Sequence, residues 1–335
     1  MKKKPFMLKP AAKDYLWGGQ RLNEEFEKEI DMSPLAETWE CSTHPDGPSI
    51  VATGEHKGQS LIDVIKNHPE YLGEHPIAIQ KANGNSPDLP ILIKFIDAKK
   101  DLSVQVHPSD EYAKINENGQ LGKTEMWYVL DATKEASLVY GLQFPVSEKK
   151  MRESIQQGTL EKYLQKVEVK KDDVFFIEAG TIHAIGSGSL IAEIQENSNL
   201  TYRLYDYDRV DKSGNKRELH VDKALAVSNL DSSSKPKQPM RVLKYKKGCA
   251  YELLNRCRYF EVYRMLLNTE RCKEMVDYQS TLDSFRVLLC IGGCGTIVVN
   301  DNETMPFFKG DCIFFPANSS VVKLHGKAQF LDVRG

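Results

Sequence analysis

Four residues from three separate segments have side chains that bind divalent metal ions. Gln105 and His107 lie in the sequence Ser-Val-Gln-Val-His-Pro, Glu125 in Gly-Lys-Thr-Glu-Met-Trp, and His183 in Gly-Thr-Ile-His. Alternate side chains of a strand point the same way, so Gln105 and His107 would face one pocket, about 7 Å apart at Cα. Glu125 and His183, from neighbouring strands, would complete a set of donors at roughly 2.0–2.2 Å from the ion. This mixed set favours zinc, with manganese or cobalt as other occupants.

Each of these residues alone also has an ordinary structural interpretation. A buried His107 or His183 can be satisfied by backbone carbonyl groups, and Gln105 or Glu125 can be a solvated strand residue. The set as a whole favours a metal site, because the remaining histidines lie mostly in polar or loop-like stretches: His44, His56, His68, His75, His220 and His325.

Three charged residues lie near these donors in the sequence. Lys123 precedes the metal-site carboxylate by two residues and would share its strand face, and Glu193 and Arg203 follow the second histidine. Arg203 has a structural alternative, an ion pair with Asp206 or Asp208. Lysine, arginine and a metal ion gathered in one place predict an anionic substrate, specifically a phosphate ester. Trp17 either packs in the core or forms an apolar floor on which a sugar ring stacks.

The composition is that of a soluble globular protein. The 335 residues are 41% hydrophobic and 27% charged, with a formal charge of −2, which gives no indication of a nucleic-acid partner. No window has the ~18 uninterrupted apolar residues of a membrane span, and residues 10–14 interrupt any signal-peptide core. The seven cysteines include no Cys-x-x-Cys pair, so we expect buried thiols in a reducing cytoplasm rather than disulfides.

Short apolar or alternating runs, typical of strands, dominate the chain at residues 92–96, 126–130, 173–177 and 190–194. Helical patterning appears at 61–66, between 145 and 163, and at 220–227. The polar segment 231–239, with two prolines, has the composition of a connector. With the chain length, it predicts two domains, 1–235 and 236–335.

An internal repeat indicates that the two domains are related. Residues 171–183 can be laid over 309–321, and each copy has a turn, an apolar strand and a second turn, as in double-sheet jelly rolls. His183 then falls on Val321, and Arg286 stands where the first copy has Glu125. A cation and an apolar residue cannot hold a metal. We therefore predict a mainly β protein with two jelly-roll barrels and inserted helices, of which only the first bears a metal.

These motifs together resemble the type I mannose-6-phosphate isomerases (phosphomannose isomerases) of the cupin superfamily, in their short bacterial form. The resemblance spans essentially the whole chain and depends on residues 15–19, 36–40, 102–108, 122–127, 180–183 and 193–209.

The resemblance implies two cupin-like barrels and one zinc ion per chain, with Gln105, His107, Glu125 and His183 as its ligands. It implies an active-site role for Arg203 and a substrate pocket lined by Trp17, Ser103, Lys123 and Glu193. Arg209 stands where the longer relatives have a lysine, and we expect it to contact the substrate.

The expected reaction interconverts mannose 6-phosphate and fructose 6-phosphate by moving a proton between C2 and C1 through a cis-enediol. Zinc would act as a Lewis acid, and Arg203, always protonated, would stabilise the anion or the phosphate. Either Glu193 or Lys123 would carry the proton, and the sequence does not rank them.

Two other functions fit the same residues. One is a different metal-dependent cupin enzyme, such as an epimerase or an oxygenase. An oxygenase would prefer two histidines and one carboxylate around iron, which is the set that remains when Gln105 is not a ligand. A non-catalytic sugar-phosphate sensor would keep the pocket without the turnover. In each case we expect a monomer or weak homo-oligomer that binds a small molecule and no membrane.

Overall fold

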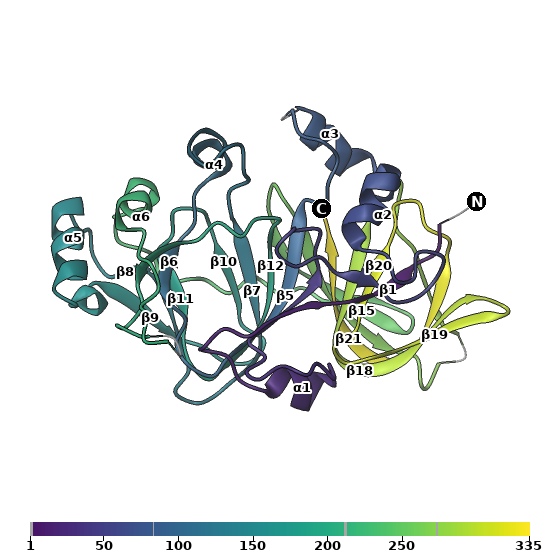
Figure 1. The fold of residues 1–335 in the computed structure, drawn as a ribbon. Helices are drawn as coiled ribbons and strands as arrows, with labels where there is room; N and C mark the ends of the chain where they lie inside the picture. The colour runs from purple at the N-terminus through teal and green to yellow at the C-terminus, as the bar shows by residue number, and fades with distance from the viewer. Residues whose placement is uncertain (1–2, 83, 211–212, 273) are drawn as a thin grey trace.

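The computed structural model describes residues 3–82, 84–210, 213–272 and 274–335. Within these residues the structure is mainly β, as predicted, and forms three antiparallel sheets (Figure 1). The six-stranded sheet has the order β10 (Val174–Ile177), β7 (Glu125–Ala132), β12 (Ser189–Glu196), β5 (Ile91–Ala98), β3 (Glu37–Cys41) and β2 (Ala11–Lys13). The five-stranded sheet has the order β13 (Tyr202–Tyr205), β6 (Val104–Val106), β11 (His183–Ile185), β8 (Ser137–Leu142) and β9 (Leu164–Glu168).

The third sheet has ten strands and contains most of the C-terminal part of the chain. Its main path is β14 (Lys244–Lys246), β15 (Cys249–Arg256), β16 (Glu261–Asn268), β21 (Val322–Arg334), β18 (Arg286–Asn300), β20 (Cys312–Phe315), β1 (Phe6–Lys9) and β4 (Ile50–Val51). Strand β17 (Val276–Tyr278) pairs with β21, and β19 (Glu303–Phe308) pairs with β18.

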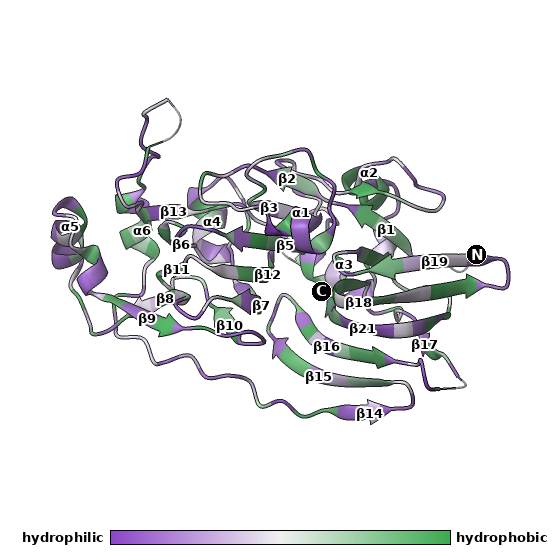
Figure 2. Ribbon diagram, turned by 90° about the horizontal axis from the view of Figure 1, so that it is seen from below, coloured by the Kyte–Doolittle hydropathy of each residue, from purple (hydrophilic) through white to green (hydrophobic). Residues whose placement is uncertain are grey.

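The helices lie outside the sheets. The predicted helices are present as α2 (Leu61–Asn67), α5 (Glu148–Gln156) with the short 3-10 turn η2 (Leu160–Lys162), and α6 (Val221–Val227), while α1 (Arg21–Phe26), the 3-10 turn η1 (Pro69–Tyr71), α3 (Glu74–Ala82) and α4 (Asp110–Asn116) were not predicted. Helix α5 is largely hydrophilic (Figure 2) and buries only Met151, Ser154 and Ile155. Among the described residues, no helix is long and apolar enough to cross a membrane.

The two smaller sheets pack face to face and position the site between them. In β12, Leu190, Ala192 and Ile194 pack on the side of the ten-stranded sheet, whereas Ile191 packs against the five-stranded sheet. Because side chains alternate along a strand, Glu193 points to the same side as Ile191. The six-stranded sheet thus has one apolar face and one face that combines apolar and charged residues.

The five-stranded sheet is built in the same way. Its Val104, Val106, Tyr202 and Leu204 belong to the apolar cluster that includes residues of α5 and α6. The residues between them, Gln105 and Arg203 among them, therefore point toward the six-stranded sheet. Val104 and Val106 thus pack behind Gln105, on the side away from the site.

The internal repeat is present in the strand register. Glu125 pairs with Ile177 in the first copy, and Arg286 pairs with Phe315 in the second, as the sequence alignment requires. The turns also match, since the backbone at Asp172 and at its counterpart Gly310 has a positive φ, 71° and 101° respectively. The second copy therefore retains the backbone of the first.

In the second copy an internal ion pair lies where the first copy has its candidate metal donors. Arg286 stands at the position of Glu125, and its Nη2 lies 2.5 Å from Asp332 Oδ2. Asp332 corresponds to Glu193, because each pairs with the residue two positions after the repeated Glu125 or Arg286. The Tyr278 hydroxyl also donates to Asp332, at 2.9 Å. In the second copy, therefore, the charge and hydrogen-bonding groups of Arg286, Asp332 and Tyr278 are paired with one another.

The six-stranded and ten-stranded sheets share one hydrophobic core. Phe6 of β1 pairs with Phe314 of β20, so the N-terminal strand completes the C-terminal sheet. Apolar residues of the six-stranded and ten-stranded sheets form a single buried cluster. Residues 233–243 have neither helix nor strand, in keeping with a connector. The boundary at residue 235 and the two separate barrels stay predictions.

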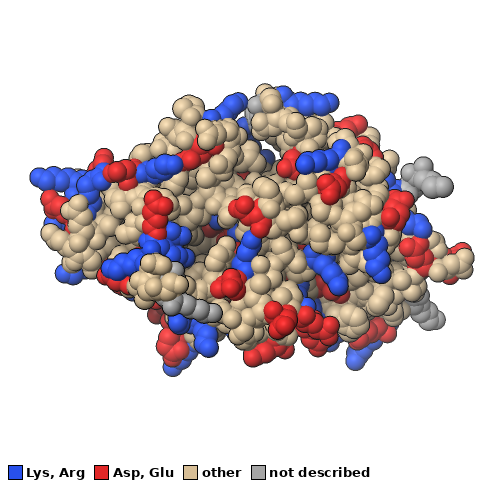
Figure 3. Space-filling model, viewed as in Figure 1, with Lys and Arg blue, Asp and Glu red and all other residues tan. Residues whose placement is uncertain are grey.

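The distribution of surface charge agrees with the composition, whereas the cysteines are not all buried as expected. Figure 3 shows Lys and Arg interspersed with Asp and Glu over one face, in keeping with the formal charge of −2. Cys41, Cys249, Cys290 and Cys312 are buried, as expected, but Cys294 is exposed.

Candidate active site

The structure brings the predicted metal donors together between the two smaller sheets. Gln105 of β6 pairs with His183 of β11, and Glu125 begins β7 on the facing sheet. The Nε2 atoms of His107 and His183 lie 3.5 and 3.4 Å from the two carboxylate oxygens of Glu125. Gln105 Nε2 lies 3.4 Å from His183 Nε2. The two histidines and the glutamate each offer an atom within 4.8 Å of the others, so one ion can contact all three.

The state of these side chains suits a cation. Glu125 is fully buried, and neither of its oxygens accepts a hydrogen bond from the described residues. His183 Nδ1 donates to the Thr181 carbonyl at 2.8 Å, which directs the Nε2 lone pair into the site. Burial lowers the pKa of His107 to about 3, and it also lowers the pKa of His183. Neutral imidazoles beside a carboxylate are the form of these ligands that binds metal.

Lys123 lies against the same donors. Its Nζ is 3.1 Å from both Glu125 Oε2 and His107 Nε2. Burial would raise the pKa of Glu125, but the pKa lies well below its usual range, and the adjacent Lys123 ammonium is the main cause that lowers it. The donor set is therefore negatively charged and already accommodates one positive group.

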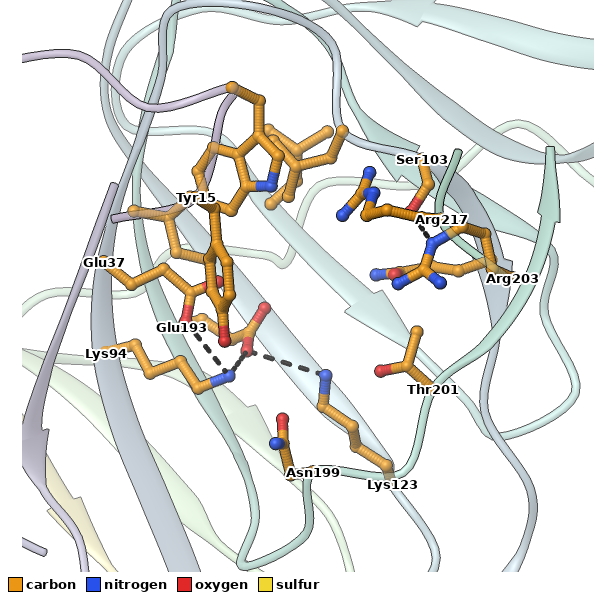
Figure 4. Close-up of a pocket in the computed structure, with 15 residues that line it drawn as sticks. Tyr15, Glu37, Lys94, Ser103, Lys123, Glu193, Asn199, Thr201, Arg203 and Arg217 are labelled. Atoms are coloured by element: carbon orange, nitrogen blue, oxygen red, sulfur yellow. Dashed lines mark hydrogen bonds and ion pairs between the residues drawn. The ribbon is translucent and has the colours of Figure 1, made fainter. Parts of the chain in front are cut away.

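A cavity of about 260 Å³ opens beside the donors. Figure 4 shows its polar side chains converging from both sheets and from the N-terminal segment. The predicted residues Trp17, Ser103, Gln105, Lys123, Glu193 and Arg203 all line it. So do polar residues that were not predicted to form the site: Tyr15, Glu37, Lys94, Asn199, Thr201 and Arg217.

One end of the cavity carries carboxylates held between lysines and tryptophans. Lys94 Nζ lies 3.4 Å from Glu193 Oε1 and 3.7 Å from Glu37 Oε2. The Trp127 indole donates to Glu193 Oε2 at 3.1 Å, and the Trp39 indole donates to Glu37 Oε2 at 2.7 Å. Burial, aided by the nearby Glu125, raises the pKa of Glu193 although lysines oppose it. Glu193 can therefore take up and release a proton nearer to neutral pH than an exposed glutamate.

The other end of the cavity carries arginines. Arg203 Nε donates to Ser103 Oγ at 3.3 Å, and its Nη1 donates to the Glu218 carbonyl at 2.8 Å. Burial and the nearby Arg217 lower the pKa of Arg203. It forms no ion pair with Asp206, so the structural alternative weighed for Arg203 is not observed.

Arg209 is not among the cavity-lining residues. Its guanidinium donates to the Asp206 carboxylate and to the Asp101 carbonyl, and it lies over the Tyr207 ring, 5.2 Å from the centroid. Arg217 lies at the cavity instead.

The cavity-lining residues that were not predicted differ in how strong a signal the sequence carries for them. Lys94 is a charged residue inside an apolar strand run, and Glu37 and Tyr15 fall within segments already noted for their family resemblance. Arg217 follows a polar turn in a stretch with no periodicity. Its proximity to the cavity depends on a contact between segments that no local pattern indicates.

Comparison with known proteins gives a consistent result. Residues 6–139 match the family model described as "Phosphomannose isomerase type I, catalytic domain". A mannose-6-phosphate isomerase of Bacillus subtilis is 36% identical over 329 residues, 98% of each chain. One of Streptococcus mutans is 35% identical over 312 residues, which are 93% of this chain and 92% of the relative.

Solved structures agree with the sequence relatives. The crystal structure of the mannose 6-phosphate isomerase from Bacillus subtilis superposes with a TM-score of 0.87 at 33% identity, covering 99% of this chain and 100% of the other. A mutant of phosphomannose isomerase from Salmonella typhimurium, at 15% identity and a TM-score of 0.75 over 98% of this chain and 99% of the other, shares the fold.

Proposed function

The chain belongs to the type I phosphomannose isomerase family, and from this membership we propose that it interconverts mannose 6-phosphate and fructose 6-phosphate. The observation that carries the proposal is a cavity lined by Gln105, a buried carboxyl group and two arginines, beside the cluster of His107, Glu125 and His183. An aldose–ketose isomerisation of a sugar phosphate needs each of these: a stabiliser of developing negative charge, a proton carrier and an anion site.

The metal proposed for this site is one zinc ion per chain, held by Gln105, His107, Glu125 and His183. When bound, it would supply Lewis-acid stabilisation of the sugar oxygens that become negatively charged during the reaction. The mixed oxygen and nitrogen donors suit zinc, with manganese or cobalt as other occupants.

The chain's own groups would move the proton between C2 and C1 of the open-chain sugar, through a cis-enediol. Glu193 Oε2 is held by the Trp127 indole, which fixes the carboxyl group while Oε1 remains near the lysines. A carboxyl group with a raised pKa is suited to take the proton from one carbon and return it to the next. Lys123, with Nζ 3.9 Å from Glu193 Oε1, is the other candidate.

The remaining cavity residues would bind and orient the substrate. Arg203 stays protonated, so it serves as an anion-binding group and not as a base. Ser103 accepts a hydrogen bond from Arg203 and would fix the direction of its guanidinium. The Trp17 ring, buried at the cavity wall, would provide the apolar floor for the sugar.

At the level of the whole chain, we place the metal-bearing unit at residues 1–235 and a metal-free unit at 236–335. We also propose a cytoplasmic enzyme that is a monomer or weak homo-oligomer.

A coupled assay with mannose 6-phosphate tests substrate and cofactor together. We expect turnover by the purified protein, loss of turnover after chelation, and recovery on adding zinc, with manganese and cobalt as comparisons. Bound iron with oxygen consumption would instead support an oxygenase. Failure of the zinc-loaded protein to exchange deuterium between solvent and fructose 6-phosphate would support a sensor.

A further inference from the structure

Arg203 and Arg217 lie at the same end of the cavity, although they belong to different segments. Both line it together with Ser103 (Figure 4). Arg203 is in β13, and Arg217 lies in the segment between β13 and α6. The carboxylates Glu37 and Glu193 lie with Lys94 at the other end. The cavity is therefore divided into an acid-bearing end and an arginine end.

Asp206 fixes the orientation of Arg217. The Arg217 Nε donates to Asp206 Oδ2 at 2.8 Å, and its Nη2 donates to Oδ1 at 2.5 Å. This two-point contact holds the plane of the guanidinium group. Within the described part of the chain, Nη1 of Arg217 donates no hydrogen bond to another residue, so its N–H groups remain for a ligand.

Arg209 differs from Arg217 in its hydrogen bonds. All three of its guanidinium nitrogens donate to the protein: Nε to the Asp206 carbonyl at 3.2 Å, Nη2 to the Asp206 carboxylate and Nη1 to the Asp101 carbonyl. Arg209 therefore has its donors engaged away from the cavity. Its contact with Asp206 supports the residue that holds Arg217.

Positive charge exceeds negative charge at the arginine end. Arg209 and Arg217 share the Asp206 carboxylate, while Arg203 forms no ion pair with the described residues. Of the neighbouring acidic groups, Asp208 pairs with Lys216 at 2.5 Å, and the side chain of Glu218 is 83% exposed. An anion with several oxygens would balance this excess.

We infer that Arg217 together with Arg203 binds the phosphate of the substrate, and that Asp206 and Arg209 are positioning residues for Arg217. The inference rests on the proposed function and names the residues that select a phosphorylated sugar. A phosphate ester carries about −1.5 to −2 charges and three acceptor oxygens, which match the free N–H groups of two guanidinium groups. Its sugar would extend toward Glu193.

Calorimetric titration of the metal-loaded protein with inorganic phosphate tests the site without requiring turnover. We expect Arg217→Gln to raise the Kd for phosphate by about tenfold or more, and Arg209→Gln to raise it less. Arg217→Lys retains the charge but loses the two-point contact, so its Kd should lie between those of the wild type and Arg217→Gln. Lys216→Gln is the matched control, since it removes a neighbouring charge that pairs outside the cavity, and its Kd should stay within about twofold of the wild type.

Steady-state kinetics separate substrate binding from chemistry. We expect Arg217→Gln to raise KM for mannose 6-phosphate about tenfold while kcat and metal content change little. A Kd for phosphate in Arg217→Gln within twofold of the wild-type value, in protein with wild-type circular dichroism, would overturn the inference. So would an effect of Arg209→Gln as large as that of Arg217→Gln. If the wild type binds phosphate through Arg217 but turns over no mannose 6-phosphate, the anion site stands and the proposed isomerase activity fails.

Discussion

Two side chains at the acid-bearing end of the cavity can carry a proton. Glu193 is 4% exposed, and its carboxyl group is fixed by Trp127 and flanked by Lys94 and Lys123. Lys123 lies closer to the metal donors than to Glu193, with 3.1 Å to Glu125 against 3.9 Å to Glu193. This difference favours Glu193 as the group that moves the proton and Lys123 as a group that stabilises negative charge.

We predict that Glu193→Gln lowers kcat by about 10²–10⁴, the usual contribution of a positioned acid–base group, and leaves the metal content unchanged. Lys123→Met should also lower kcat, and because Lys123 touches Glu125 and His107, its metal content should be measured as well. Glu252→Gln is a suitable control, since Glu252 is equally buried but pairs with Arg264, at 2.5 Å, in the ten-stranded sheet. If both cavity variants kept kcat within a few-fold of the wild type, neither residue would be the proton carrier.

Among the elements, the strand pairs β7–β10 and β18–β20 show how one backbone arrangement supports two different interiors. The first pair presents Glu125 to the candidate metal site, and the second presents Arg286 to Asp332. A buried ion pair contributes little net stability, but removing one partner leaves an uncompensated charge. The second copy therefore depends on the Arg286 guanidinium to compensate the charge of the buried Asp332 carboxylate.

We predict that Arg286→Met destabilises the protein by about 3–5 kcal/mol, because Asp332, at 1% exposure, loses its partner. The double variant Arg286→Met with Asp332→Leu should recover much of that loss. Arg152→Met removes an arginine from an exposed helix pair and should cost no more than about 1 kcal/mol. Urea unfolding followed by circular dichroism measures all three. Equal stability of Arg286→Met and Arg152→Met would contradict the prediction.

The molecule as a whole is held together by a core that crosses the predicted domain boundary. Ile93 and Phe95 of the six-stranded sheet belong to the same buried cluster as Val287 and Leu331 of the ten-stranded sheet. The Phe6 ring also stacks on Phe314, with centroids 5.3 Å apart. The face of the six-stranded sheet opposite the cavity is thus covered by the C-terminal part of the chain.

We predict that residues 1–235 produced alone do not form an active enzyme, because the apolar face of the six-stranded sheet would be exposed and β1 would lose its pairing with β20. Production of 1–235 together with 236–335 should restore turnover of mannose 6-phosphate, at least in part, since the missing contacts are non-covalent. Solubility, circular dichroism and the isomerase assay compare the two preparations. A soluble fragment 1–235 with wild-type kcat would show that the N-terminal part folds independently.

The sequence by itself determined the features that depend on local periodicity and side-chain chemistry. The alternation of Val104, Gln105 and Val106 shows which side chain faces inward, because successive residues of a strand point to opposite sides. The candidate metal-donor cluster could be predicted from residue types, because two imidazoles, a carboxylate and an amide are all groups that bind divalent metal ions. The repeat likewise predicted the register in which Arg286 replaces Glu125.

The tertiary structure alone decided which distant segments meet. Arg209 and Arg217 are both basic residues in polar stretches, and only the fold turns Arg217 toward the cavity while Asp101 and Asp206 engage Arg209. The pairing of β1 with β20 likewise joins residues that are about three hundred positions apart. Such contacts depend on how several sheets pack together. The residues that determine this packing are spread over the whole chain, so no single segment predicts the contacts.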